Sequence, residues 1–179
     1  IIGISSSKSV SASIINSLKK LEYRGYDSAG VATLFDGEIK EVKSEGRVDA
    51  LEQNFDLKNL RGNIGIGHVR WATHGVPSSV NAHPHSSDNV SVVHNGIIEN
   101  STILKKYLMT KGHKFKSQTD TEVIVHLITE NLKTYDLEEA ITKTLKQLHG
   151  SFALGIIFKD IPDLIIGARR GSPLAVGYG

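Results

Sequence analysis

The sequence contains no cysteine among its 179 residues. Disulfide bonds and thiolate metal sites are therefore excluded for the chain as given. No apolar stretch approaches the roughly 20 residues that a bilayer-spanning helix needs, and the N-terminus does not resemble a signal peptide. No run of basic residues is longer than two, and the net charge is only +2, which argues against a nucleic-acid or membrane partner. We expect a cytoplasmic protein.

The composition that is present is typical of one globular domain. Hydrophobic residues make up 39% and charged residues 22%, as in ordinary folded proteins. A chain of this length can bury roughly 70% of its unfolded surface. The sequence begins with Ile1-Ile2-Gly3, without an initiating methionine, and stops directly after an apolar segment. We therefore expect residues 1–179 to be a fragment of one domain from a longer chain.

Apolar periodicity predicts a mixture of strands and helices. Strands are predicted at residues 1–5, 30–35, 39–43, 64–71, 90–93, 152–158 and 164–168. Helices are predicted at residues 10–21, 48–54, 103–109, 120–128 and 137–148. Ser9 is expected to cap the first helix, Thr119 to cap the fourth in a capping box with Glu122, and Asp36-Gly37 to form a hairpin turn. Sheets with helices packed outside them would bury these apolar faces, so we expect an α+β fold.

The first polar cluster follows the apolar strand at residues 64–71. It comprises residues 67–75 (GHVRWATHG) and 81–85 (NAHPH), in a long stretch with almost no periodicity. Loops of this length inside a compact domain are usually functional or disordered. The guanidinium of Arg70 could hold a carboxylate through two parallel hydrogen bonds. The alternative is a surface arginine whose stem covers an apolar edge.

Three histidines of this cluster, His74, His83 and His85, raise the question of a metal site. Zinc sites usually combine three or four ligands at compact spacing, and each ligand has a further hydrogen-bond partner that orients it. Here no cysteine and no acidic residue lies among the histidines. We therefore expect loop-ordering or substrate-contacting histidines, and neither a metal nor another cofactor.

The second cluster is His94-Asn95-Gly96, directly after the strand predicted at residues 90–93. An asparagine side-chain amide and a neighbouring glycine N–H can converge on one point. Such preorganised donors, aimed at developing negative charge, form an oxyanion hole. The alternative is an ordinary Asn-Gly turn that closes the strand.

The third cluster is Asp120 within the predicted capping box. A carboxylate in the first turn of a helix is favoured by the helix dipole, and the same carboxylate could pair with a substrate ammonium. Together the clusters would supply a carboxylate-binding cation, an ammonium-binding anion and an oxyanion hole. These groups suit a free amino acid whose side-chain carbonyl is attacked. The sequence supplies no nucleophile for that attack, because no Ser or Thr lies in a nucleophile-elbow pattern.

Five segments in the same order carry a resemblance to one family. They are residues 22–30 (EYRGYDSAG), 67–75 (GHVRWATHG), 81–85 (NAHPH), 93–100 (VHNGIIEN) and 119–123 (TDTEV). They resemble the glutaminase domain of the glucosamine-6-phosphate synthases, which are class II glutamine amidotransferases. The resemblance covers the whole chain. Phosphoribosylpyrophosphate amidotransferases and asparagine synthetases share the general scheme but differ at residues 71–74 (WATH).

This resemblance implies an N-terminal nucleophile hydrolase fold, a four-layer αββα sandwich. In that family the mature chain begins Cys-Gly-Ile, and the cysteine thiol attacks the glutamine amide with its own α-amine as base. A thioester forms, ammonia leaves, and water frees glutamate. The alignment places that cysteine two residues before Ile1, so it is absent from this sequence.

The resemblance also implies roles for ten residues. Arg70 would hold the α-carboxylate of glutamine, Asp120 its α-ammonium, and Asn95 with Gly96 would form the oxyanion hole. Trp71, Thr73 and His74 would form a loop that closes over glutamine. His83 would line the site, and Arg24 and Gly25 would shape the surroundings of the nucleophile.

In the full-length protein, the resemblance implies a sugar-phosphate isomerase half that uses the ammonia to convert fructose 6-phosphate into glucosamine 6-phosphate, within a homodimer. Two alternatives differ from this hypothesis. One is a module that binds glutamine without hydrolysing it. The other is the amidotransferase domain of a phosphoribosylpyrophosphate amidotransferase.

Overall fold

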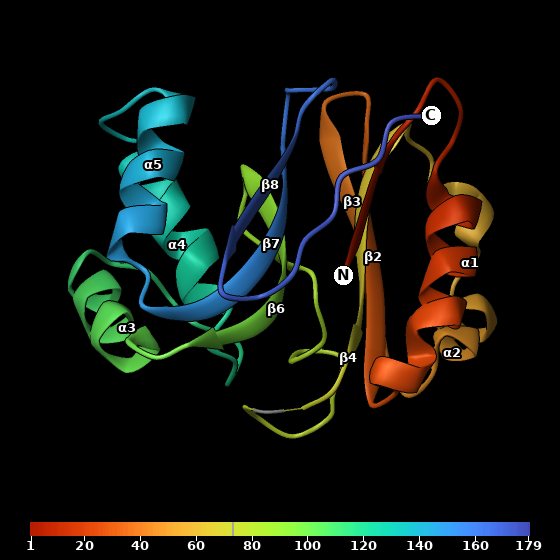
Figure 1. Ribbon diagram of the computed structural model, residues 1–179, viewed down its shortest axis with the longest axis horizontal. Helices are drawn as coiled ribbons and strands as arrows, with labels where there is room; N and C mark the ends of the chain where they lie inside the picture. The colour runs from red at the N-terminus through yellow and green to blue at the C-terminus, as the bar shows by residue number, and fades with distance from the viewer. Residues whose placement is uncertain (73) are drawn as a thin grey trace.

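Two antiparallel sheets pack face to face in the computed structural model, which describes residues 1–72 and 74–179 (Figure 1). The strands are β1 (Ile2–Ser5), β2 (Ser28–Phe35), β3 (Glu38–Glu45), β4 (Ile64–Arg70), β5 (His85–Ser86), β6 (Val90–Ile98), β7 (Gly150–Phe158) and β8 (Ile165–Arg170). The helices are α1 (Ser11–Leu21), α2 (Val48–Asn54), α3 (Ser101–Thr110), α4 (Glu122–Asn131) and α5 (Leu137–Gln147), with short 3₁₀ turns η1 (Glu22–Arg24) and η2 (Leu57–Asn59). The strand orders are β1-β4-β2-β3 and β5-β6-β7-β8.

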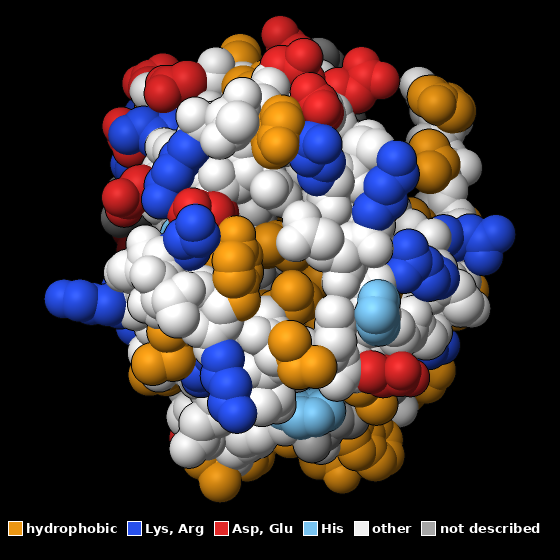
Figure 2. Space-filling view, turned by 90° about the vertical axis from the view of Figure 1, so that its left-hand side faces the viewer, with side chains coloured by type: hydrophobic (Ala, Val, Ile, Leu, Met, Phe, Trp, Pro, Cys, Tyr) orange, Lys and Arg blue, Asp and Glu red, His pale blue; other side chains and the backbone are white. Residues whose placement is uncertain are grey.

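The helices lie on the two outer faces of this pair of sheets. Figure 1 shows α1 and α2 against the first sheet and α3, α4 and α5 against the second. The layer order is therefore helix, sheet, sheet, helix, which confirms the predicted αββα sandwich. Figure 2 shows that basic side chains on the α3–α5 face are interspersed with acidic, polar and hydrophobic ones. In the part of the chain that the structure describes, no helix is long and apolar enough to cross a membrane.

Three apolar clusters fill the spaces between these layers. The cluster between the sheets is formed by Ala32, Leu34, Ile64, Ile66, Val93 and Ile157. The cluster under α1 and α2 includes Ile14, Ile15, Leu18, Val48 and Leu51. The cluster under the other three helices includes Leu104, Leu108, Ile124, Leu127 and Ile128. Each layer contact thus buries the apolar stripe that the sequence periodicity predicts.

The hairpin of β2 and β3 also confirms its sequence signal. Asp36 and Gly37 have φ angles of 51° and 77°, and Phe35 pairs with Glu38 across the turn. Two positive φ angles at the central residues match the turn whose twist suits a two-residue hairpin. β2 begins at Ser28, two residues earlier than predicted, because it pairs with β4 from Ser28 onwards.

The predicted cap at Ser9 is wrong. α1 begins at Ser11 after Val10, and no side chain caps it. The backbone N–H of Val10 donates to Gly62 O at 2.9 Å, and Val10 is fully buried. Packing against the neighbouring segment therefore decides where this helix begins, and a local capping side chain does not.

The predicted capping box is also wrong. α4 begins at Glu122, and the preceding Thr121 makes no side-chain cap hydrogen bond. The Glu122 carboxylate instead accepts from Lys116 N at 2.8 Å and from Ser117 N and Oγ, both at 2.7 Å. These hydrogen bonds hold the loop that precedes α4 against the Glu122 carboxylate. Asp120 consequently lies before the helix and not in its first turn.

The predicted end of the strand at residue 93 is the third error. β6 continues to Ile98, and Asn95 and Gly96 pair with Ala153 and Phe152 of β7. The Asn-Gly turn is therefore not formed. Gly96 has φ 138°, and a Cβ built there would lie 2.0 Å from Ser151 O. Only glycine fits this position, and its presence reflects close approach of two strands and not a turn.

Replacement of Ile66 tests the packing between the sheets. Ile66 is 0% exposed and Ile103, on the outer face of α3, is 71% exposed. We expect Ile66→Ala to lower the free energy of unfolding by about 2–5 kcal/mol, because the cavity left behind cannot close. Ile103→Ala is the matched control and should change it by about 0.5 kcal/mol or less. Urea denaturation measures both, and equal effects would contradict this account of the core.

Candidate active site

A cavity of about 590 Å³ lies at one edge of the sheets, where β4 ends and β6 continues. Of the ten residues predicted for the site, eight line it: Arg24, Arg70, Trp71, His74, His83, Asn95, Gly96 and Asp120. Gly25 is not among its lining residues, and Thr73 lies outside the described residues. Segments far apart in the sequence therefore meet around one space.

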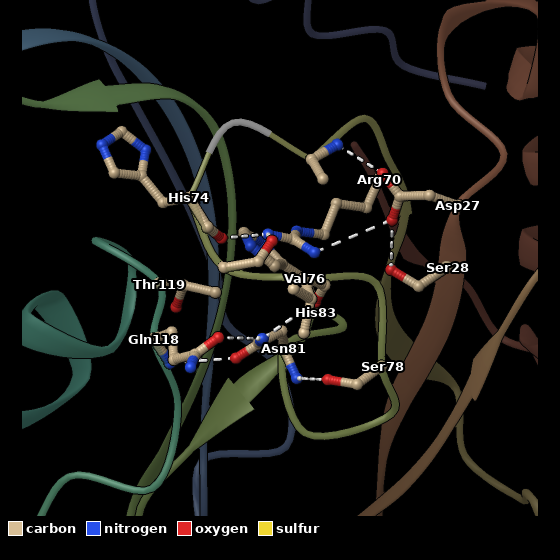
Figure 3. Close-up of polar contacts among 12 residues, drawn as sticks. Asp27, Ser28, Arg70, His74, Val76, Ser78, Asn81, His83, Gln118 and Thr119 are labelled. Carbon is tan, nitrogen blue, oxygen red and sulfur yellow. Dashed lines mark hydrogen bonds and ion pairs between the residues drawn. The ribbon is translucent and has the colours of Figure 1, made fainter.

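Arg70 is the buried cation of this cavity. It ends β4 with 4% of its surface exposed, so the alternative of a surface arginine is wrong. Its Nη2 donates to the carbonyl oxygens of His74 and, at 3.2 Å, Gly75. Burial lowers the pKa of Arg70, whereas the carboxylates of Asp27 and Asp120 act to raise it. The loop after β4 thus folds onto the guanidinium (Figure 3).

Asp27 supports Arg70 and was not predicted. Its Oδ1 lies 3.8 Å from Nη1 of Arg70 and accepts from Ser28 Oγ at 2.8 Å. Its Oδ2 accepts from Ala72 N. One carboxylate at the start of β2 thereby contacts both Arg70, the last residue of β4, and Ala72 in the loop that follows. The residue lies within the segment 22–30, but its role depends on the pairing of β2 with β4, which the sequence pattern did not reveal.

Gly25 lies directly against the backbone at the end of β4. A Cβ built on Gly25 would lie 2.6 Å from the carbonyl carbon of Arg70 and 2.7 Å from its oxygen. These are backbone atoms that cannot move aside. Gly25 therefore contributes by allowing close approach, while the neighbouring Arg24 reaches the cavity itself.

Asn81 ties the loop after β4 to the segment before α4. Its Nδ2 donates to Val76 O at 2.9 Å and to Gln118 Oε1 at 3.2 Å, and its Oδ1 accepts from Gln118 N at 2.9 Å (Figure 3). Asn81 is buried, and no role was predicted for it although it lies in the NAHPH segment. A buried, fully bonded amide of this kind specifies one loop conformation.

Asp120 and Gly96 lie along the same edge of β6. The Oδ2 atom of Asp120 accepts from Ile98 N at 2.7 Å, and the backbone N–H of His94 donates to His83 Nδ1 at 3.3 Å. Alternate N–H groups of a strand point to the same edge. The N–H of Gly96 therefore lies between two amides that are already bonded, on the edge that faces away from β7. The Asn95 side chain is exposed beside it in the cavity.

Four buried histidines form the wall behind this edge: His68, His83, His85 and His94. The rings of His68 and His83 stack with centroids 4.3 Å apart, and those of His83 and His85 meet edge to face at 4.9 Å. His68 was not predicted, although it precedes Arg70 by two residues and so lies on the same face of its strand. The described residues include no group of three or more His, Cys, Asp or Glu that could hold a metal ion.

Burial is the main cause of the low pKa of these histidines. It lowers the pKa of His85 from 6.5 to about 3 and that of His94 to about 4, and it places those of His68 and His83 well below 6.5. Neighbouring positive groups act in the same direction on each ring, whereas the carboxylate of Glu122 opposes the shift at His85 and that of Asp120 opposes it at His94. All four rings are therefore neutral near pH 7.

The loop after β4 also carries an exposed aromatic residue. Trp71 is 66% exposed at the cavity, with its ring 6.4 Å from that of Tyr26. His74 lines the cavity as well, and its carbonyl oxygen is held by Arg70. The His74 backbone is thus held by Arg70, while the side chains of Trp71 and His74 lie at the cavity.

Comparisons with known proteins identify relatives by sequence and by fold. The family described as "Glutamine amidotransferase domain" matches residues 68–175. Proteins named glutamine–fructose-6-phosphate aminotransferase [isomerizing] are 52% identical in Zymomonas mobilis and 54% identical in Mesorhizobium japonicum, over the whole of this chain. The chain spans about 30% of the length of these curated relatives.

A solved structure with a similar fold is the glutamine phosphoribosylpyrophosphate amidotransferase from B. subtilis complexed with ADP and GMP. It is 32% identical with a TM-score of 0.77, over 87% of this chain and 34% of its own. A structure described as the allosteric regulatory enzyme of purine biosynthesis gives 31% identity and the same TM-score and coverage.

The buried histidines predict a pH dependence of stability. In the unfolded chain they gain protons near pH 6.5, whereas His94 and His85 in the folded chain gain them only near 4 and 3. Below pH 6.5 the unfolded chain therefore binds more protons, and the free energy of unfolding should fall from pH 7 to pH 5. Above pH 6.5 this contribution is fully present.

Urea denaturation at pH 7, 6 and 5, followed by circular dichroism, measures this effect. His149→Gln removes an exposed imidazole that does not belong to the cluster and is the matched control, with the same dependence on pH expected. A denaturation midpoint that does not change between pH 7 and pH 5 would show that the four rings are not buried in the neutral form.

Proposed function

The chain belongs to the glutamine amidotransferase domain family, and on that premise we propose that it binds L-glutamine and hydrolyses the side-chain amide to glutamate and ammonia. One observation carries the proposal. A single cavity contains a buried guanidinium, a buried carboxylate and an Asn-Gly pair on a strand edge. These groups match the α-carboxylate, the α-ammonium and the amide oxygen of glutamine.

The charged groups of the cavity hold the amino-acid end of glutamine. Arg70 pairs with the α-carboxylate and Asp120 with the α-ammonium. Both side chains are buried, and Asp120 is close enough to act on the pKa of Arg70. A free amino acid carries both of these charges on one carbon, so a neighbouring cation and anion select it over a peptide-bound glutamine.

The hydrolysis itself proceeds through a cysteine placed two residues before Ile1. Ile1 lines the same cavity, which supports delivery of the thiol to the bound amide. The thiolate bonds to the amide carbon while the carbonyl electrons move to oxygen. The Asn95 side-chain N–H and the Gly96 N–H donate to this oxyanion. The cysteine α-amine, having taken the thiol proton, gives it to the leaving nitrogen, and ammonia departs.

Water then completes the cycle. It attacks the thioester, glutamate leaves, and the thiol is regenerated. Trp71, Thr73 and His74 form a loop that closes over glutamine and keeps bulk water out of the thioester step. His83 lines the wall of the site, and Arg24 with Gly25 shapes the surroundings of the thiol.

The ammonia is passed on within a longer protein. Residues 1–179 are a fragment of its glutamine amidotransferase type 2 domain, and a sugar-phosphate isomerase half uses the ammonia to convert fructose 6-phosphate into glucosamine 6-phosphate. The names of the relatives at 52–54% identity support this acceptor over the phosphoribosyl acceptor that the name of the structure at 32% identity indicates. A homodimer in the cytoplasm remains our prediction for the whole protein.

Adding Cys-Gly ahead of Ile1 tests the reaction. We expect the extended protein, with its initiating methionine removed and its N-terminus verified by mass spectrometry, to release glutamate and ammonia from glutamine in equal amounts. Ser-Gly ahead of Ile1 is the matched control and should be far slower, because a hydroxyl is much less ionised than a thiol. The chain as given should gain thermal stability from glutamine without hydrolysing it.

The outcomes separate the hypotheses. No glutamate above background from the folded Cys-Gly protein would end the proposal of hydrolysis. Stabilisation by glutamine in that inactive protein would favour the module that only binds it. No stabilisation in either protein would remove glutamine as the ligand.

Substitutions in the cavity test the assigned roles in the Cys-Gly protein. Arg70→Ala should raise KM strongly, since loss of one partner of a buried charge pair costs about 3–5 kcal/mol. Asn95→Ala should instead lower kcat by roughly a hundred-fold or more with a smaller change in KM. Arg169→Ala, at an exposed arginine of β8, is the control and should change neither. Unchanged kinetics in Arg70→Ala would remove Arg70 from the site.

A further inference from the structure

The hydroxyl of Thr121 joins three segments that are distant in the sequence. Thr121 is 0% exposed and lies between the cavity carboxylate Asp120 and the start of α4. Its Oγ1 lies 2.9 Å from His94 Nδ1 on β6 and 3.3 Å from His83 Nε2 on the loop after β4. The backbone N–H of His94 in turn donates to His83 Nδ1 at 3.3 Å. These contacts form a closed ring of hydrogen bonds.

The ring determines where each proton lies. His83 Nδ1 accepts from a backbone N–H, so a neutral His83 carries its proton on Nε2 and donates it to Thr121. The threonine hydroxyl then donates its own proton to His94 Nδ1, since no other acceptor contacts it within the described residues. His94 is consequently protonated at Nε2, an atom that is buried and has no hydrogen-bond partner within the described part of the chain.

Adjacent residues therefore hold β6 at two points. Thr121 holds the His94 side chain, and the Asp120 carboxylate accepts from the Ile98 N–H at 2.7 Å. Between these points lie Asn95 and Gly96. Strand β5 pairs with β6 only at Ser91 and Val92. Beyond it, within the described sheet, the side chains of His83 and Asp120 accept from the edge N–H groups of His94 and Ile98.

We propose that Thr121 is a positioning residue, which sets the separation between the oxyanion donors on β6 and the ammonium-binding carboxylate of Asp120. The inference rests on the proposed function, because both groups are assigned by it. Thr121 touches neither the amide nor the nucleophile in this account. It acts through His94, which precedes Asn95, and through its covalent link to Asp120.

Thr121→Val tests this role because valine has the shape of threonine without the hydroxyl. In the Cys-Gly protein we expect kcat to fall by about ten-fold to a hundred-fold, since a displacement of about 1 Å has effects of this size. KM should change less, because Arg70 and the hydrogen bond from the Ile98 N–H to Asp120 remain. Thr121→Ser keeps the hydroxyl and should recover most of the rate.

Thr144→Val is the matched control for loss of a buried hydroxyl. Thr144 is 1% exposed, and its Oγ1 accepts from Asn131 Nδ2 at 2.9 Å where α4 meets α5, away from the cavity. It should lower the thermal stability as Thr121→Val does, with kcat unchanged. A loss of kcat in Thr144→Val equal to that in Thr121→Val, or no recovery in Thr121→Ser, would reduce Thr121 to a merely structural residue.

Nitrogen NMR of the histidine rings provides a readout that does not depend on catalysis. Two-bond ¹H–¹⁵N correlation spectra at pH 7.5 should show His94 of the unsubstituted chain protonated at Nε2 alone. In Thr121→Val the ¹⁵N resonance of His94 Nδ1 should shift, because the hydroxyl that donates to it is lost, whereas Thr144→Val should leave it unchanged. An unchanged ¹⁵N resonance of His94 Nδ1 and an unchanged kcat in Thr121→Val would overturn the proposal. An inactive Cys-Gly parent would refute the hydrolysis, and the NMR spectra would still decide whether the ring of hydrogen bonds exists.

Discussion

The permanent positive charge of Arg70 lies at the end of β4 with almost no exposed surface. A buried charge is strongly unfavourable unless groups of opposite polarity surround it. Asp27 supplies a carboxylate, and the carbonyl oxygens of His74 and Gly75 accept hydrogen bonds. Satisfying this one charge brings the start of β2 and the loop after β4 together (Figure 3), and Arg70, Trp71 and His74 then line one wall of the cavity. A cation held in this way needs little reorganisation to receive a carboxylate.

The opposite wall depends on an unpaired strand edge. β5 is only two residues long, so beyond Val92 the amides on that edge of β6 need other partners. His83 and Asp120 provide them at His94 and Ile98. Unpaired edges commonly invite unwanted pairing with other chains, but here bonded side chains cover the edge on both sides of Gly96. The same arrangement presents one N–H to the cavity.

Local signals in the sequence failed where tertiary contacts competed with them. Ser9 and Thr119 have the residue types of helix caps, yet packing of Val10 and the hydrogen bonds of Glu122 decide where α1 and α4 begin. Asn95-Gly96 has the composition of a turn, yet β7 offers a partner to every residue and extends the strand. Capping and turn preferences contribute about 1 kcal/mol. Burial of an apolar face contributes more free energy than this and therefore decides the outcome.

The sequence by itself determined the layered α+β fold and the segments that supply the cavity, because helix and strand periodicities of 3.6 and 2 residues are local properties. It also indicated Arg70, Asp120, Asn95 and Gly96, through residue types at strand ends and through a family resemblance. Only the tertiary structure decided that Asp27 partners Arg70, that Thr121 bridges two histidines and that four imidazoles are neutral. Partners of buried polar groups come from segments tens of residues apart, and no local pattern specifies the distance between them.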